Sequence, residues 1–239
     1  MNTYFSTAET KILKKLNSPT KIQDFLNGLK FNFEEKGETC YSSRMVLKHR
    51  KAHCMEGAMF AAAVLEFHGD KPLVMDLRSV DNDFDHVVAV FKQFGCFGAI
   101  SKTNHAVLRY REPIYKTVRE LVLSFFHEYF LDSGKKTLRE YSRLLDLRYF
   151  DTHPLLASPI PPSLKLRRAG KGVENADSLP LVGRAREGVN WRTSEKDLFE
   201  IPEYLDSIRH YPILRKSQIK NLRRADKIEI QAGKLVEYK

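Results

Sequence analysis

The feature that most constrains this chain is an apolar stretch from Met55 to Phe67, in which Glu56 and Glu66 are the only charged residues. A helix that is apolar almost all round belongs in the centre of a core rather than on a surface. Gly69 follows where a glycine commonly ends a helix in the left-handed conformation. The sequence therefore predicts a buried central helix around which the rest of the fold is built.

Cys54 stands at the N-terminal end of this predicted helix. Free backbone N–H groups and the helix dipole favour a negative thiolate at that place. A cysteine in an apolar setting is more often an inert core residue, so the helix-start position is what makes Cys54 a candidate nucleophile. Cys40, in a predicted loop, and Cys96, near a predicted turn, are interpreted as incidental.

The length of 239 residues allows one large domain, or one domain of ordinary size with an extension. The longest apolar run, Ala58 to Leu65, is far shorter than the roughly 20 residues that cross a bilayer. Residues 1–17 carry no signal-peptide pattern, and no membrane anchor is expected. Three irregularly spaced cysteines argue against a disulfide framework and predict a reducing, cytoplasmic location.

Local patterns predict helices and strands in alternation over the first 150 residues, which indicates an α+β domain. Ser6 and Ser18-Pro19 are expected to open the first two helices, and a turn near Gly95 is expected to join two strands of a hairpin. The expected elements are helices after Ser6 and Ser18, a loop at 30–41, a short element at 44–49, strands at 71–77, 86–91, 97–101 and 106–110, a long helix opened by Pro113, and a short helix at 138–145.

The composition changes at residues 153–163, where four prolines exclude a helix or an interior strand. We therefore expect a domain at 1–150 and, at 151–239, a proline-rich linker followed by a basic C-terminal extension that packs on the core. Within the extension, residues 164–188 are weakly patterned. The second half of 191–205 is expected to be helical and residues 227–239 to form a hairpin.

Three features follow one another along the chain in an order that suits cysteine catalysis. Cys54 begins a helix, His86 begins a strand, and polar residues follow the next strand. Such chemistry needs a thiolate, an imidazole that accepts and returns a proton, and a group that orients the imidazole. In a hairpin turning near Gly95, His86 lies opposite Thr103, and Ser101 shares its face. Ser101, Thr103 and Asn104 therefore compete as the orienting group.

The segments His53-Cys54-Met-Glu-Gly-Ala and Asp85-His86-Val-Val, with Gly69 and a strand between them, resemble the core of the transglutaminase-like superfamily. The resemblance covers about residues 20–130 and implies a papain-like fold, with Cys54 as the nucleophile and His86 as the base. It also implies an aspartate at the end of the second hairpin strand, where this chain has Ser101. Asn104 is then the candidate for the part that asparagine plays in papain-like enzymes.

The remaining cleft residues follow from the same arrangement. The backbone N–H of Cys54 and a donor near Tyr41 or Ser43 are candidates for an oxyanion pocket. Asp85 is a candidate for the cleft wall. No metal is expected, although His49, His53, Cys54, His68 and His86 are numerous, because they lack the close paired spacing of zinc ligands. No other cofactor is expected.

The formal net charge of +10 and the isoelectric point near 9.4 permit an acidic partner such as nucleic acid, although excess surface lysine and arginine is the commoner reason. Residues 213–224 could form a helix with a basic face suited to phosphates. Its candidate contacts are Arg215, Lys216, Lys220, Arg223 and Arg224.

Two functions are therefore open. The first is a cysteine-dependent acyl-transfer enzyme acting on a peptide or another amide, of protease, amidase or transglutaminase type. The second is a non-catalytic transglutaminase-like module that binds protein or nucleic acid through its basic surface. The sequence predicts no oligomeric state.

Overall fold

The computed structural model describes residues 4–153 and 190–234, which form an α+β fold as the sequence predicts. Its strands are β1 (Lys30–Phe31), β2 (Lys51–Ala52), β3 (Leu73–Arg78), β4 (His86–Gln93), β5 (Cys96–Ile100), β6 (Arg111–Tyr115), β7 (Glu140–Ser142), β8 (Leu145–Asp146) and β9 (His210–Pro212). Its helices are α1 (Thr7–Lys15), α2 (Pro19–Asn27), α3 (Ser43–His49), α4 (Cys54–Phe67), α5 (Val118–Phe126), α6 (Tyr149–Thr152), α7 (Glu200–Ser207), α8 (Lys216–Lys220) and α9 (Lys227–Ala232).

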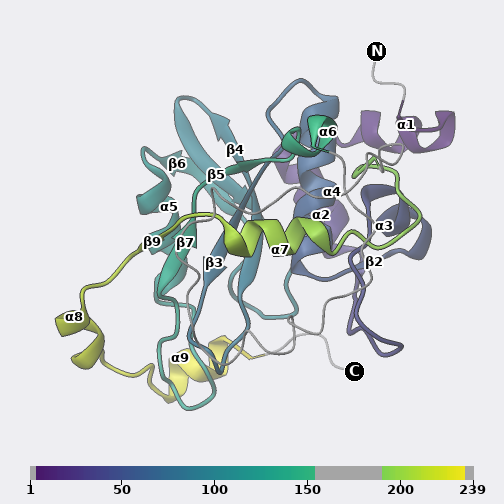
Figure 1. Cartoon of the computed structure of the whole chain (residues 1–239). Coiled ribbons are helices and arrows are strands. Elements are labelled where there is room, and N and C mark those ends of the chain that lie inside the picture. The colour runs from purple at the N-terminus through teal and green to yellow at the C-terminus, as the bar shows by residue number, and fades with distance from the viewer. Residues whose placement is uncertain (1–3, 154–189, 235–239) are drawn as a thin grey trace.

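Most of the described strands belong to one antiparallel sheet in the order β6-β5-β4-β3-β7-β9, with β8 also paired to β3 (Figure 1). Strands β1 and β2 form a separate parallel pair. No described helix is long and apolar enough to cross a membrane.

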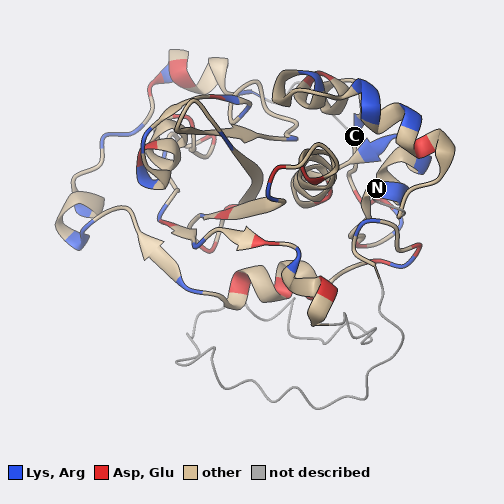
Figure 2. Ribbon diagram, turned by 90° about the horizontal axis from the view of Figure 1, so that it is seen from above, with Lys and Arg blue, Asp and Glu red and all other residues tan. Residues whose placement is uncertain are grey.

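Helix α4 confirms the predicted central helix. All its residues from Met55 to Leu65 are buried, and it packs on the sheet face that presents Val74, Val87 and Ala89. Helices α2 and α3 contact it from the side away from the sheet, and Figure 2 shows α4 end-on between these layers. Gly69 has φ +98°, as expected of the residue that ends the helix. The helix is buried because nearly every side chain it carries is apolar.

Helix α5 covers the opposite face of the sheet. Leu121, Val122 and Phe125 pack there against Met75 and Val88 in a second apolar cluster. Thr117 caps α5, accepting from the N–H of Glu120, whose carboxylate in turn accepts from the N–H of Thr117. The sheet is therefore buried on both faces near its centre.

The predicted hairpin is confirmed, including its register. Phe94 and Gly95 both have positive φ, as a two-residue hairpin turn requires, and Ala89 pairs with Ile100. Extending this register places His86 opposite Thr103, although the strand itself ends at Ile100. The hairpin thus brings the first residue of β4 beside the chain that leaves β5.

The chain beyond β5 differs from the prediction. Residues 106–108 form bends and 109–110 are irregular, and the next strand is β6, which contains Pro113. The expected helix at Pro113 is wrong because β6 is an edge strand of the sheet, where a proline without an N–H is tolerated. The helix begins five residues later, at Val118.

Two further predictions of local structure are wrong. Residues 138–145 supply strands β7 and β8 instead of a helix, because they complete the sheet beside β3. Residues 227–232 form helix α9 instead of a hairpin strand, and Asp226 and Glu229 form its capping box. Residues 235–239, the rest of the expected hairpin, lie outside the described residues.

The described part of the C-terminal region contributes to the same core. Trp191 and Ile201 are fully buried with the α4 cluster, and β9 pairs with β7. Arg192, with its side chain 1% exposed, forms ion pairs with Glu66 of α4 and Asp151 of α6. The proline-rich segment and the weakly patterned stretch after it fall within 154–189, outside the described residues. The division at residue 150 stays a prediction.

Candidate functional site

Cys54 is the first residue of α4 and is half-buried, so its thiol is neither sealed in the core nor fully exposed. The chain that leaves β5 passes very close to this end of the helix. A Cβ on Gly57 would lie 2.4 Å from the Cβ of Lys102. Only glycine permits this approach, which holds the neighbouring residue Ser101 near the start of α4.

The imidazoles of His53 and His86 both act on the thiol of Cys54. Burial by itself would raise the pKa of the thiol, but the hydrogen bonds and positive charge of the two imidazoles lower it from 9.0 to about 5. Cys54 is therefore a thiolate at neutral pH. The electrostatic effect of His86 on Cys54 agrees with the predicted pairing of the two residues, which stays a prediction.

His86 is buried, and its Nε2 lies 2.7 Å from the hydroxyl oxygen of Ser101. That hydroxyl donates its single proton to the carbonyl of Leu108, at 2.7 Å. Ser101 can therefore only accept from His86, which assigns the proton of the neutral ring to Nε2. Nδ1 is left unprotonated and open to the thiol, which is the tautomer that can accept a proton from Cys54.

Gln23 of α2 fixes Ser101 in place. Its amide accepts from the N–H of Ser101 at 2.9 Å and donates to the carbonyl of Ser101 at 2.7 Å. Gln23 is buried, and both of these contacts are buried too. The sequence reasoning missed this residue. The signal was a polar side chain on the apolar face of a helix, next to Ile22 and three residues before Leu26.

The structure separates the three competing orienting groups. Ser101 contacts the ring of His86. Thr103 is buried, but its hydroxyl accepts from the N–H of His105. Asn104 forms none of the described contacts with His86, because it lies in the bend after the strand. Of these three residues, Ser101 is the one that contacts the imidazole of His86.

The expected donors for an oxyanion pocket are used elsewhere. The N–H of Tyr41 donates to Glu56 at 3.0 Å, and the hydroxyl of Ser43 is buried, 3.5 Å from the carbonyl of Met59. These contacts occupy the N–H of Tyr41 and the hydroxyl of Ser43, and a part for either residue in an oxyanion pocket stays a prediction. The N–H of Cys54 remains, because the first residue of a helix has no intrahelical acceptor for it.

Asp85 directly precedes His86, and its carboxylate accepts from the N–H and hydroxyl of Ser79 at 2.7 and 3.1 Å. Although the residue is exposed overall, its carboxyl turns inward. Desolvation there, together with the charge of Asp76, raises its pKa to about 6. Asp76 itself is paired with His210 at 3.0 Å. Asp85 therefore serves the loop before β4 rather than the imidazole.

His53 and Glu56 form a second polar group at the start of α4 that the sequence reasoning did not assign to the site. His53 is the N-cap residue, and its Nδ1 accepts from the N–H of Met55 at 3.3 Å. The carboxylate of Glu56 accepts from the N–H of His53 at 2.9 Å. A charged residue within an apolar helix, three positions after a cap, was the available signal.

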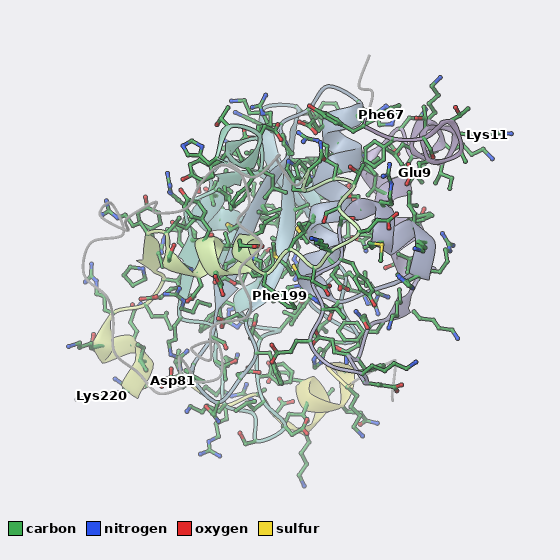
Figure 3. The ribbon with its side chains drawn as sticks, turned by 45° about the vertical axis from the view of Figure 1, so that its right-hand side comes forward. Glu9, Lys11, Phe67, Asp81, Phe199 and Lys220 are labelled. Atoms are coloured by element: carbon green, nitrogen blue, oxygen red, sulfur yellow. The ribbon has the colours of Figure 1, made fainter. Side chains whose placement is uncertain are left out.

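The five basic candidates lie away from this site, from Arg215 just before α8 to Arg224 after it, and Figure 3 shows Lys220 at the periphery of the molecule. The helix there has only five residues instead of the twelve expected, and Arg223 is paired with Asp226 and Glu229. Lysine and arginine are spread over many elements in Figure 2. Arg215, Lys216, Lys220 and Arg224 are exposed, and nucleic-acid binding by them stays a prediction.

Among the described residues, no group of three or more histidine, cysteine, aspartate or glutamate side chains is placed to hold a metal ion.

Neither a protein-family model nor a curated protein matches this sequence.

Proposed function

We propose that this chain is a cysteine-dependent acyl-transfer enzyme of papain- or transglutaminase-like type, with Cys54 as nucleophile and His86 as proton carrier. The observation that carries the proposal is the chain of contacts from Cys54 through His86 to Ser101, at the start of a buried helix. A thiol with a pKa of about 5 beside an imidazole in the accepting tautomer is an activated nucleophile.

The chemistry follows from this arrangement. With the proton of Cys54 held on His86, the thiolate attacks the carbonyl carbon of an amide, forming a carbon–sulfur bond. The N–H of Cys54 donates to the oxygen that becomes negative. The carbon–nitrogen bond then breaks as His86 returns the proton to the departing amine. Water or a second amine, losing a proton to His86, attacks the thioester and releases Cys54.

Ser101 supports this cycle less strongly than a carboxylate would. A neutral hydroxyl fixes the orientation and tautomer of His86 but adds no negative charge to stabilise the imidazolium. We therefore expect turnover to be slower than in a site with an aspartate behind the histidine. The thiolate of Cys54 should nevertheless be stable.

An activated ester tests the proposal without knowledge of the natural substrate. With p-nitrophenyl acetate, the wild type should release a burst of p-nitrophenol and carry an acetyl group on Cys54, which peptide mass spectrometry can locate. Cys54→Ala should abolish the burst. His86→Gln should retain slow acylation and lose about 100-fold or more of the turnover.

Cys96→Ser is the matched control and should behave as the wild type, since Cys96 lies in β5 at the turn of the hairpin. Acetylation spread equally over Cys54 and Cys96, or turnover unaffected by His86→Gln, would exclude the enzymatic proposal.

A further inference from the structure

The group behind His86 is neutral, yet a fully buried carboxylate lies on the other side of the same thiol. Glu56 of α4 has an exposed fraction of 0% and accepts from the side chains of Asn32 and Thr39 and from the N–H groups of Tyr41 and His53. These contacts come from the loop before α3 and from the start of α4. Because Glu56 accepts hydrogen bonds from all of these donors and donates none of them, it acts as a carboxylate.

Glu56 also lies beside the ring of His53, with its Oε1 3.5 Å from Nε2. The carbonyl of Thr39 is 3.1 Å from the same nitrogen, and the carboxylate of Glu34 is 3.8 Å away. Because all three are acceptors, Nε2 of His53 carries a proton in either charge state of the ring. The nitrogen that gains or loses a proton is therefore Nδ1, on the side of the helix start.

We propose that His53, held by the buried carboxylate of Glu56, is a second imidazole partner of Cys54 and stabilises its thiolate. This inference rests on the proposed function and adds a residue to it. His53 is the N-cap residue directly before Cys54, with Nδ1 at the start of α4, so its ring is placed to act on the reacting sulfur. Glu56, which acts through His53, is a positioning residue.

The electrostatics at His53 agree with this geometry. Burial alone would lower the pKa of the ring, but the hydrogen bond with Cys54 and the charge of Glu56 raise it from 6.5 to about 9. When the ring takes a proton at Nδ1, it gives up the N–H of Met55 and donates to the thiolate instead. The charged groups that face this pair are Glu34, Glu56 and His86, with the hydroxyl of Tyr129 further away.

The arrangement divides the requirements of the site between two histidines. His53 has carboxylates behind it and suits a lasting positive charge, whereas the Nε2 of His86 contacts the neutral hydroxyl of Ser101. The carboxylate that the site lacks behind His86 is thus present behind His53.

The test is the pH dependence of Cys54 alkylation by iodoacetamide in the full chain. His53→Asn keeps a good N-cap residue and removes the imidazole. It should raise the alkylation midpoint by about one to three pH units with His86 intact. Glu56→Gln, of equal size, should shift the midpoint the same way by a smaller amount. Glu34→Gln, 3.8 Å away and less buried, is the matched control and should shift it least.

The histidine signals of the wild type provide a second measurement that does not depend on a variant folding. NMR titration should show His53 protonated well above its ordinary pKa of 6.5, and Cys54→Ser should lower its midpoint. An ordinary midpoint for His53 in both proteins, or an unchanged alkylation profile in His53→Asn, would overturn the proposal and leave His53 as a helix cap. If the wild type shows these pKa shifts but does not turn over p-nitrophenyl acetate, the proposed function is overturned instead.

Discussion

At the scale of single residues, the proposed chemistry depends on the tautomer of His86. The hydroxyl of Ser101 sets it, because the proton of that hydroxyl is given to Leu108 and only its lone pairs face the ring. The backbone of Ser101 is in turn held at both its N–H and its carbonyl by Gln23. A serine can thus replace the orienting function of an aspartate while omitting its charge.

Ser101→Ala removes this acceptor and leaves the Nε2–H of His86 without its partner. The rate of acetyl-enzyme turnover should fall about 10- to 100-fold, the loss expected when one hydrogen bond to a charged group is removed. Thr103→Ala is the matched control, because it removes a buried hydroxyl two residues away that contacts His105 instead. Equal losses in the two variants would show that the Ser101 hydroxyl has no special role.

Sequence reasoning reached Cys54, His86 and Ser101 because helix start, strand start and hairpin register place them together. It left Ser101, Thr103 and Asn104 open, because the choice depends on where the chain bends after Ile100. It missed Gln23, His53 and Glu56 because their partners are backbone groups and side chains of loops. Such contacts have no periodic pattern that a sequence displays.

At the scale of elements, the position of the site depends on how closely the chain after β5 approaches α4. Strong periodic or apolar patterns predicted α1, α2, α4 and the β4–β5 hairpin correctly. The errors were short segments, such as β7 and β8, whose structure is decided by pairing with a distant strand. Pairing within the sheet also decided the conformation at Pro113, which lies in β6, an edge strand.

Gly57→Ala tests the close approach. In an exposed helix, this change stabilises by up to about 1 kcal/mol. Here the new Cβ would meet Lys102 at 2.4 Å, so we expect the free energy of unfolding to fall by about 1–3 kcal/mol and Cys54 alkylation to slow.

Gly28→Ala is the control, since its nearest contacts would be ordinary ones of 3.5 Å or more and its φ is −78°. Urea denaturation of the two variants checks the prediction, and a stabilised Gly57→Ala protein would contradict it.

At the scale of the whole molecule, Arg192 joins the C-terminal region to the central helix. Its guanidinium contacts both carboxylate oxygens of Glu66 at 2.5 and 2.6 Å and both of Asp151 at 2.7 and 2.9 Å. It also stacks on the rings of Tyr4 and Trp191. Segments from the two ends of the chain thus meet at α4, which no local pattern predicts.

Arg192→Met keeps most of the side-chain volume and leaves two carboxylates without their partner. We expect the free energy of unfolding to fall by about 3–5 kcal/mol, as for other broken buried ion pairs, measured by urea denaturation. Arg223→Met removes an exposed arginine that also has two carboxylate partners, and should leave the midpoint nearly unchanged. Similar midpoints for the two variants would contradict the role given to Arg192.

The most direct test of the activated thiol is the rate of Cys54 alkylation by iodoacetamide as a function of pH in the wild type. The thiolate fraction rises as the pH rises through the pKa, so the rate should be near its maximum by about pH 6 and fall as the pH drops below about 5. Cys40 should stay unreactive, because burial and the charge of Glu56 raise its pKa. A midpoint for Cys54 near the ordinary value of 9.0 would contradict the account.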